Sequence, residues 1–558
     1  MMAKGANAAI LYRPEGYATT GPRLMGRQAA GEGFLRGFVR HAEVDRLFCY
    51  TPKRDDAAHF VEAAKAAGNQ RPIQWLNEVD ARSAGEAGTL YLPDPSLSLH
   101  AWRRRRFDQR GYSIVGVTHT TASAGAMDWI SGLQLAPVQE WDALVCTSVV
   151  VRETVEFVLE AQAEFLRARL GAQAFPRPQL PVIPLGIDTE SFTPDAGKRA
   201  SARKALGIGD EDIVVLFVGR LSFHAKAHPL PMYLGLERAA RAQPKTRIHL
   251  IQAGWFANDF IENAFKSGAA TFCPSVKCKF VDGRNGAARQ QAWQAADIFT
   301  SLSDNIQETY GLAPVEGMAA GLPSVVTDWN GYRDTIRDGV DGIRVPTIMP
   351  PPGWAEDLAD RHAAAIDNYD HYCGFASQFV AVDPDSCAAA YGKLIADPAL
   401  RKQMGDAARA RAVAEFDWRV VIGKYQQLWA ELMDRRKTAK ESASREAGRP
   451  AHPTRADPFH AFASYATATL APEDRIAPAP GADAKTFDAV TGSPLVAFAR
   501  TVNPPPEEMH KLLATLQQQG GATVADLAQR WPDANRTLMA RSLLWLAKLG
   551  LVRVTRKG

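Results

Sequence analysis

"ETYGLAPVEGMAAGLPSVV", residues 308–326, predicts a short helix that is followed at once by a buried strand. Pro314 suits the first helical turn, where its missing N–H costs nothing, and Gly321 suits the left-handed position just after a helix. The proline two residues later prevents the helix from continuing, and β-branched residues come next. We therefore expect a helix near residues 313–320, with Glu308 in the loop before it.

The loop and the first turn of this helix form a natural seat for an anion. Backbone N–H groups around Tyr310, Gly311 and Leu312 have no partner within the helix, and glycine lets a ligand approach the backbone closely. A carboxylate beside that seat would repel phosphate, so we expect Glu308 to accept hydrogen bonds from hydroxyls and Glu316 to do so for a ribose. Sugar hydroxyls at both ends of a diphosphate describe a nucleotide sugar. The alternative is that Glu308 caps the helix and Glu316 is solvated.

Apolar runs alternate with helical patterns on both sides of this stretch, in two successive sets. The first set has runs at residues 8–12, 46–51, 113–119, 143–148 and 180–188, and the second begins at residues 212–221 and 247–254. Strands that alternate with helices favour a parallel sheet covered on both faces. The sequence thus predicts an α/β fold with two doubly wound, Rossmann-like domains facing a cleft. Ligands in such sheets bind beyond the C-terminal ends of the strands.

The length of 558 residues is too great for one hydrophobic core, so we expect several domains. The predicted parts are an N-terminal acceptor-side domain at 1–185, a nucleotide-sugar-binding domain with a closing helix at 186–436, a linker at 437–485 and a winged-helix-like domain at 486–558. The linker is rich in Ala, Pro, Arg and Asp, whereas the last part shows a helix, a short turn, a helix that Asn535 can cap, and a strand. Residues 355–382 show no clear strand and have the character of an insertion.

The composition is that of a soluble globular protein, with 46% hydrophobic and 23% charged residues. No apolar run approaches the roughly 18 residues needed to span a bilayer, and the first residues lack a leader pattern, so we expect a cytoplasmic protein. Cys273 and Cys278 have no second pair nearby, which argues against zinc, and we expect all six cysteines to be reduced. The "DPD" at 383–385 is interpreted as a helix cap rather than a metal-binding motif.

Several stretches resemble glycosyltransferase family 4. They are "VIPLGIDTESFTPD" (182–195), "VVLFVGRLSFHAK" (214–226) and the segment 308–346, in the order and at the separations usual for that family. The resemblance covers roughly residues 8–435 and is most specific from 182 to 346. It implies a GT-B fold and retaining transfer of a sugar from a nucleotide-activated donor. It also implies that neither a metal nor another cofactor is needed, because basic side chains hold the diphosphate.

The resemblance also implies roles for particular residues. Glu308 and Glu316 match the family's Glu-x7-Glu pair, at the donor sugar and at the ribose. Arg220 and Lys226 match the basic pair that neutralises the leaving diphosphate. His119 matches a histidine at the cleft edge that bonds the donor sugar or positions the acceptor hydroxyl; its alternative is a packed histidine after a strand.

Two features near the expected phosphates are less well defined. Gly21 and Gly26 lie in the first loop, where the family places a glycine near the phosphates, and the sequence does not show which of them has that role. Lys226 is followed by Ala227, where the family has glycine, so the adjoining loop is expected to differ.

The C-terminal part leaves its partner open. It carries nine Lys or Arg against five Asp or Glu from residue 487 onward, a mild basic excess. We expect contact with a protein or peptide, or self-association, through residues 486–558, and nucleic acid is the less favoured partner. A macromolecular acceptor recruited by this part is one hypothesis.

Two other functions share the predicted fold. One is a catalytically inactive protein that binds nucleotide sugars or regulates a partner. The other is phosphorolysis or epimerisation, although no motif for a pyridoxal lysine is present. The donor base, the sugar and the acceptor are not determined by the sequence.

Overall fold

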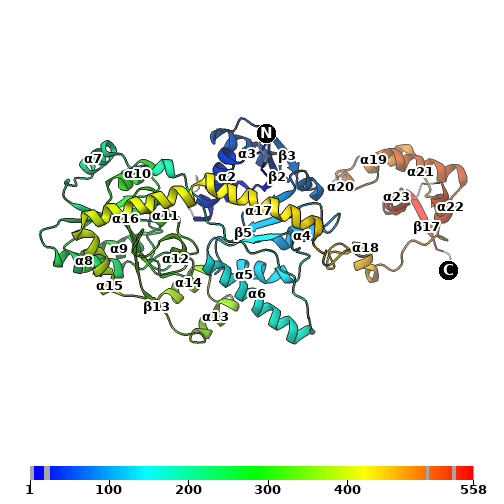
Figure 1. The fold of residues 1–558 in the computed structure, drawn as a ribbon. Helices are drawn as coiled ribbons and strands as arrows, with labels where there is room; N and C mark the ends of the chain where they lie inside the picture. The colour runs from blue at the N-terminus through cyan, green and yellow to red at the C-terminus, as the bar shows by residue number, and fades with distance from the viewer. Residues whose placement is uncertain (1–4, 18–25, 498–501, 531–535, 557–558) are drawn as a thin grey trace. The chain divides into compact units, whose positions relative to one another are not determined.

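The computed structural model describes residues 5–17, 26–497, 502–530 and 536–556 (Figure 1). The chain divides into two compact units, residues 1–453 and residues 454–558. The first unit contains two parallel six-stranded sheets, and the second contains a small sheet with helices. Within the described residues, no helix is both long enough and apolar enough to cross a membrane.

The first sheet has the strand order β3-β2-β1-β4-β5-β6, with every pair parallel. All but the edge strand β3 are fully buried, as expected for strands covered on both faces. Its strands are β1 (Ala9–Leu11), β2 (Leu47–Thr51), β3 (Ile73–Asn77), β4 (Thr89–Tyr91), β5 (Ser113–Val117) and β6 (Ala143–Val145). Its helices include α2 (Gly26–His41), α3 (Arg54–Ala66), α4 (Leu97–Arg104), α5 (Ala124–Ser131) and α6 (Val149–Leu170).

The second sheet repeats this order as β12-β11-β10-β7-β8-β9, again with every pair parallel. Its strands are β7 (Ile213–Val218), β8 (Ile248–Gly254), β9 (Lys277–Asp282), β10 (Ile298–Ser301), β11 (Ser324–Thr327) and β12 (Gly342–Val345). Its helices include α7 (Ala196–Ala205), α8 (Leu230–Ala242), α9 (Asp259–Phe272), α10 (Gly286–Ala295), α11 (Leu312–Ala319), α15 (Pro384–Ala396) and α16 (Pro398–Arg411). The strand order reverses between β7 and β10, and ligands of doubly wound sheets bind at such a point. The predicted fold class of two Rossmann-like domains is confirmed.

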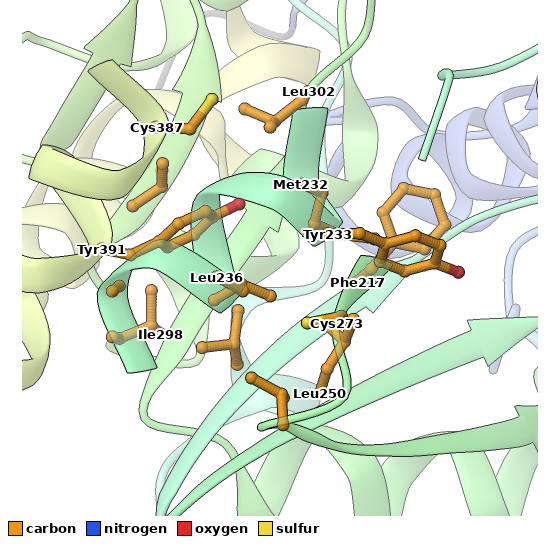
Figure 2. Close-up of a cluster of buried hydrophobic side chains, with 14 of the residues drawn as sticks. Phe217, Met232, Tyr233, Leu236, Leu250, Cys273, Ile298, Leu302, Cys387 and Tyr391 are labelled. Carbon is orange, nitrogen blue, oxygen red and sulfur yellow. The ribbon is translucent and has the colours of Figure 1, made fainter. Parts of the chain in front are cut away.

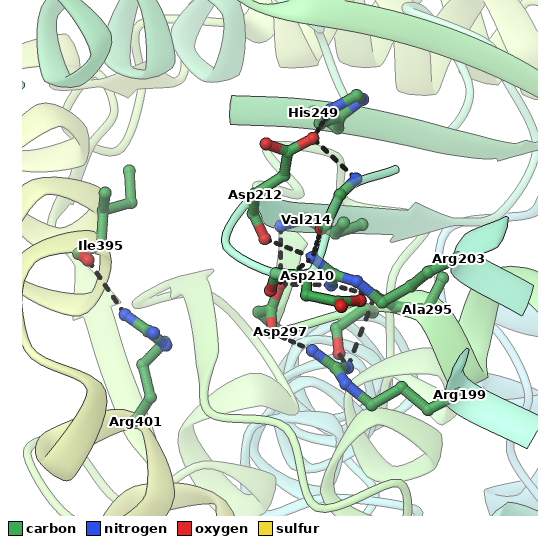
Figure 3. Close-up of polar contacts among 12 residues, drawn as sticks. Arg199, Arg203, Asp210, Asp212, Val214, His249, Ala295, Asp297, Ile395 and Arg401 are labelled. Atoms are coloured by element: carbon green, nitrogen blue, oxygen red, sulfur yellow. Dashed lines mark hydrogen bonds and ion pairs between the residues drawn. The ribbon is translucent and has the colours of Figure 1, made fainter. Parts of the chain in front are cut away.

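One face of the second sheet packs against α8 and α15, and the other face packs against α10 and α11. Figure 2 shows Phe217 and Leu250 from the strands beside Met232 and Leu236 from α8, with Tyr391 from α15. At the start of β7, a buried polar network holds α7 to the sheet (Figure 3). Arg203 donates to the carbonyls of residues 209, 212 and 295 and pairs with Asp297.

The long helix α17 (Trp418–Thr438), yellow in Figure 1, connects the two domains of the first unit. Sequence order places it with the second domain, but its apolar face from Trp418 to Leu432 belongs to the core of the first domain. A Cβ on Gly37 of α2 would lie 2.7 Å from the Trp418 ring, so helix and indole meet closely. Phe416 just before the helix and its aromatic residues Trp418, Tyr425 and Trp429 are all buried.

The predicted linker at 437–485 is shorter in the structure. Residues 439–451 lie against the first domain, where Arg105 donates to the carbonyls of Ala443 and Ala451 and Gln109 donates to Glu441. Near its other end, β15 (Arg475–Pro478) pairs with strands of the second unit. Hydrogen bonds to its backbone therefore attach the first part of this stretch to the first domain, and strand pairing places residues 475–478 in the second unit, although the composition of the whole stretch is typical of a linker.

The second unit is a helical module with one small antiparallel sheet of order β16-β15-β17. Its core joins Ile476 of β15 to Leu512, Leu516 and Leu543 of the helices. The predicted helices correspond to α22 (Val524–Gln529) and α23 (Arg536–Lys548), and the predicted strand corresponds to β17 (Val552–Thr555). The unit also contains α18 (Pro458–Ala461), a 3₁₀ turn (Ala463–Tyr465), α19 (Ala484–Thr491), α20 (Pro494–Ala497), α21 (Pro506–Gln519) and β16 (Ala522–Thr523). The expected cap Asn535 lies outside the described residues, and the winged-helix assignment stays a prediction.

Residues 347–382 form an excursion from the second domain. Two short strands, β13 (Thr347–Ile348) and β14 (Ala381–Val382), pair in antiparallel fashion as its stem. Between them lie α13 (Glu356–Ala363) and α14 (Tyr369–Ser377). The expectation of no strand here is wrong for the two residues of β14. Asp383 caps α15 by accepting from the backbone N–H groups of residues 385 and 386, which confirms the predicted cap.

Candidate functional site

The candidate site lies where the second sheet reverses its order. Arg220 and Lys226 belong to the loop after β7, and Glu308 belongs to the loop after β10. Since β7 and β10 are parallel neighbours, both loops leave the same edge of the sheet. The topology therefore brings together residues that lie some 80 positions apart in the chain.

Lys226 and Glu308 form an ion pair between Nζ and Oε2, with side chains only 18% and 9% exposed. The other carboxylate oxygen of Glu308 accepts from the backbone N–H of Thr309 at 3.2 Å and of Tyr310 at 3.4 Å. The hydroxyl of Tyr332 donates to Oε2 at 3.4 Å. Burial raises the pKa of Glu308, but the charge and hydrogen bond of Lys226 outweigh it, so the pKa lies below its usual value. Glu308 is thus held as a carboxylate.

Arg220 is fixed by two acceptors. Its Nη2 donates to the carbonyl of Ala225 at 2.9 Å and to Oε1 of Gln307 at 2.6 Å. Gln307 is positioned in turn, because its N–H donates to the side chain of Asn305 at 2.9 Å. This arrangement holds a permanent cation in the same loop as Lys226.

The helix α11 begins beside this cluster and matches its predicted limits within one residue. Gly311 is its N-cap with φ of 91°, and a Cβ there would collide with the ring of Tyr332. Leu312 is the first helical residue, so the free N–H groups of the helix start lie next to Glu308. Gly321, with φ of 71°, ends the helix as predicted.

Glu316 lies within α11 and is partly buried. Burial raises its pKa to about 7, and the nearby charge of Arg289 partly opposes this shift. Among the described residues, no group donates a hydrogen bond to this carboxylate. A half-buried carboxyl of this kind can accept hydrogen bonds from ligand hydroxyls.

The first domain contributes its own strand ends to the site. The Thr309 hydroxyl donates to the carbonyl of His119 at 3.2 Å, which places His119 next to the Glu308 loop. The Ser148 hydroxyl donates to the carbonyl of Thr309 at 2.8 Å. His119 follows β5 and Ser148 follows β6, so the carboxyl edges of both sheets meet here.

The structure does not test the role predicted for the two glycines near the phosphates. Gly21 lies outside the described residues. Gly26 opens α2 and is exposed, and a Cβ there would meet no heavy atom within 4 Å. Crowding therefore does not require a glycine at this position, and its role in phosphate binding stays a prediction.

Several residues of the site were not singled out from the sequence. Tyr332 and Gln307 position Glu308 and Arg220, as described above. Asp304 follows β10, is 3% exposed and accepts from the His228 N–H at 3.3 Å. Burial raises its pKa to about 7. Asp304 and Gln307 both lie within five residues of Glu308, so a search of the Glu308 loop for polar side chains would have found them.

The rest of the described chain offers no metal centre, since no three His, Cys, Asp or Glu side chains are placed to hold an ion. A separate cavity of about 280 Å³ lies where the chain crosses between the domains, and none of the predicted site residues lines it. Its lining includes Arg36, Arg40, Asp188 and Arg419, of which Arg40 and Asp188 form an ion pair at 3.1 Å.

Comparison with known protein families finds a match within the second domain. Residues 198–377 match the family described as glycosyl transferases group 1. A D-inositol 3-phosphate glycosyltransferase of Mycolicibacterium vanbaalenii is 32% identical over 240 residues, which are 40% of this chain and 50% of that protein. The chain thus spans about half the length of this curated relative.

Two further proteins are similar over more of the chain. A GDP-mannose-dependent alpha-(1-6)-phosphatidylinositol monomannoside mannosyltransferase of Mycolicibacterium smegmatis is 23% identical over 75% of this chain and 98% of its own length. The structure of Anabaena Alr3699/HepE with UDP and glucose covers 76% of this chain and all of that one, at 15% identity and a TM-score of 0.49. The family match therefore extends over the second domain from α7 through α14.

Proposed function

We propose that the protein is a retaining glycosyltransferase that moves a sugar from a nucleotide-sugar donor to a hydroxyl acceptor. The observation that carries this proposal is the convergence of Arg220, Lys226 and Glu308 at the start of α11, where the second sheet reverses its order. Two cations and free backbone N–H groups there suit a diphosphate, and the carboxylate suits sugar hydroxyls.

In the proposed reaction, the bond from the anomeric carbon to the diphosphate oxygen breaks and a bond to the acceptor oxygen forms. The acceptor proton passes to the released diphosphate. Negative charge grows on that diphosphate, and Arg220 and Lys226 stabilise it because they are already in place. Glu308 orients the donor sugar, Glu316 binds the ribose, and His119 positions the reacting hydroxyl. The retained configuration at the anomeric carbon rests on the resemblance to family 4.

We propose an anionic polyol or an inositol lipid as the first acceptors to test. The names of the curated relatives point to inositol phosphate and phosphatidylinositol derivatives. At the carboxyl edge of the first sheet, Arg13 and Arg103 both pair with the buried Glu78, which leaves a net positive charge. Burial of Glu78 raises its pKa, but hydrogen bonds from the two arginines bring it below its usual value, so the carboxylate neutralises only one of them.

We propose that the second unit is a winged-helix-like module that contacts a protein or peptide and recruits the acceptor. Its independent core and its basic residues support a separate binding role. A chain that ends at residue 453 should keep hydrolysis of the donor but lose transfer to a recruited acceptor. Unchanged transfer to the native acceptor would remove this role.

The transferase proposal is tested with a panel of UDP-, GDP- and ADP-sugars in the presence of EDTA. We expect slow hydrolysis of one donor without acceptor, and loss of that activity in Glu308→Ala. Activity that requires a divalent metal would contradict the proposal that Arg220 and Lys226 hold the diphosphate without a metal.

All six cysteines have free thiols, and five of them are buried. Because free thiols are typical of proteins in reducing compartments, we propose a cytoplasmic location for the enzyme.

A further inference from the structure

The excursion at residues 347–382 is attached to the loop that carries Arg220 and Lys226. The Asn305 side chain donates to the carbonyl of His224 at 2.8 Å and to that of Cys373 in α14 at 3.5 Å. A Cβ on Gly374 would lie 3.0 Å from Cβ of His224, so α14 and this loop are in close contact. The inner side of the excursion is therefore part of the wall of the candidate site.

The excursion is also braced internally. Arg361 of α13 forms two hydrogen bonds of 2.7 Å with Asp367, one to each carboxylate oxygen. The rings of His362 and Tyr372 stack with centroids 4.1 Å apart. Asn368 caps α14 by accepting from the N–H of His371 at 2.9 Å. These contacts fix the first turn of α14 and the direction of its first side chain.

That first side chain, Tyr369, reaches the other domain. Its hydroxyl lies 3.2 Å from the hydroxyl of Thr120, the residue directly after His119. The N–H of Ala122 donates to the same Thr120 oxygen at 3.3 Å, which fixes it in place. Burial raises the pKa of Tyr369, and Arg220 is near enough for its charge to oppose that rise. The phenol thus contacts the segment that carries His119 and lies near Arg220.

We infer that Tyr369 is a positioning residue for the transfer reaction. By bonding Thr120 it holds the excursion across the side of the donor site, and this wall excludes water from the donor sugar. The inference rests on the proposed function, because its consequence is a preference for the acceptor hydroxyl over water. Removing the Tyr369 hydroxyl should let water compete, and should loosen two segments that lie far apart in the sequence.

The test uses the full chain and three single substitutions. Tyr369→Phe and Thr120→Val each remove one side of the hydrogen bond and keep the shape of the side chain. Tyr372→Phe is the matched control, since it lies on the same helix and its ring contact with His362 does not need the hydroxyl. A double variant, Tyr369→Phe with Thr120→Val, tests whether the two effects share one cause.

The first readout is amide hydrogen exchange without added ligand. Tyr369→Phe should speed exchange about fivefold both in residues 118–124 and in residues 368–378, as expected for the loss of one neutral hydrogen bond. Thr120→Val should speed exchange in residues 368–378 to the same extent; within residues 118–124 it also removes the acceptor of the Ala122 N–H, so only its effect on the other segment is compared. The double variant should add little at 368–378, and Tyr372→Phe should leave residues 118–124 unchanged. Unchanged exchange at 118–124 in Tyr369→Phe together with unchanged exchange at 368–378 in Thr120→Val, or an equal change in Tyr372→Phe, overturns the contact between the domains.

The second readout is the ratio of hydrolysis to transfer, measured with UDP-glucose and GDP-mannose as donors and inositol phosphate as the acceptor. Tyr369→Phe and Thr120→Val should raise this ratio about fivefold, whereas Tyr372→Phe should not. If the wild type turns over neither donor, the proposed function with these sugars fails and the positioning role fails with it. If the wild type is active and the ratio is unchanged in both variants, only the present inference is overturned.

Discussion

Replacing Lys226 with methionine tests the buried ion pair of the candidate site most sharply. Methionine keeps much of the side-chain volume and removes the charge. The Glu308 carboxylate, 9% exposed, would then keep only the N–H groups of Thr309 and Tyr310 and the hydroxyl of Tyr332. Leaving one charge of a buried pair without its partner costs about 3–5 kcal/mol. Because three donors remain and Lys226 is 18% exposed, we expect a loss of about 2–3 kcal/mol in the free energy of unfolding.

Glu308→Gln, which changes the other partner of the ion pair, and the variant with both substitutions complete a double-mutant cycle. Glu308→Gln leaves the lysine, which can turn its charge toward solvent, so we expect a smaller loss of about 1 kcal/mol. The variant with both substitutions should be more stable than the sum of the two losses predicts, by about 1–2 kcal/mol. Urea unfolding of the full chain at pH 7.5, followed through the transition of the first unit, measures all four proteins.

The pH dependence has a definite sign. The pKa of Glu308 is lower in the folded protein than its usual 4.5, so its stabilising contribution is present above pH 4.5 and is lost as pH falls through the folded pKa. The difference between wild type and Lys226→Met should therefore be full near pH 8 and shrink as pH falls toward 4.5, because without Lys226 burial raises the pKa of Glu308 and the variant neutralises this carboxylate before the wild type does. Additive effects in the cycle, or a loss below 0.5 kcal/mol for Lys226→Met, would refute the account of this pair.

Three further substitutions test other parts of the site. Asp304→Asn should stabilise the protein by on the order of 2 kcal/mol at pH 8 and little at pH 5. The buried carboxyl has a pKa of about 7, above its usual 3.8, so the stability of the wild type falls as the pH rises from 5 to 8. Equal effects of the substitution in thermal melts at both pH values would contradict this. Glu316 should ionise near pH 7, and the carboxylate should bind UDP more tightly than the neutral acid, so the UDP affinity of the wild type should rise from pH 6 to pH 8. Glu316→Gln should remove this part of the rise, and titration calorimetry of both proteins at pH 6 and pH 8 measures it. Gly311→Ala should cost about 2–4 kcal/mol, more than Gly353→Ala, since both glycines have positive φ but only the former meets a ring; similar melting temperatures would argue against that collision.

The parts of the fold that the sequence predicted are those with local signals. The limits of α11 follow from a proline in its first turns and from Gly321 at its end, and the cap at Asp383 follows from its position before a helix. The repeated alternation of apolar runs predicted both sheets. The cluster of Arg220, Lys226 and Glu308 follows from the topology, since strand ends at one edge of a parallel sheet lie together.

The parts that could not be predicted depend on contacts between distant residues. Composition alone made residues 437–485 a linker, but Arg105 and Gln109 bind the backbone of its first part, and a four-residue strand ends in Pro478 near its other end. The bonds from Gln307 to Arg220 and from Tyr369 to Thr120 each join segments that only the folded chain brings together. The periodicity of apolar residues in the sequence does not predict such contacts between distant segments.

We propose that a nucleoside diphosphate binds between the basic loop after β7 and the start of α11. Titration calorimetry of the full chain with UDP, GDP and ADP tests it directly, in wild type, Arg220→Ala and Lys226→Met. We expect one nucleotide to bind the wild type, and each substitution to weaken its affinity at least tenfold, because each removes a cation from the diphosphate. Folded wild-type protein that binds none of the three, or affinity unchanged by both substitutions, would contradict the claim.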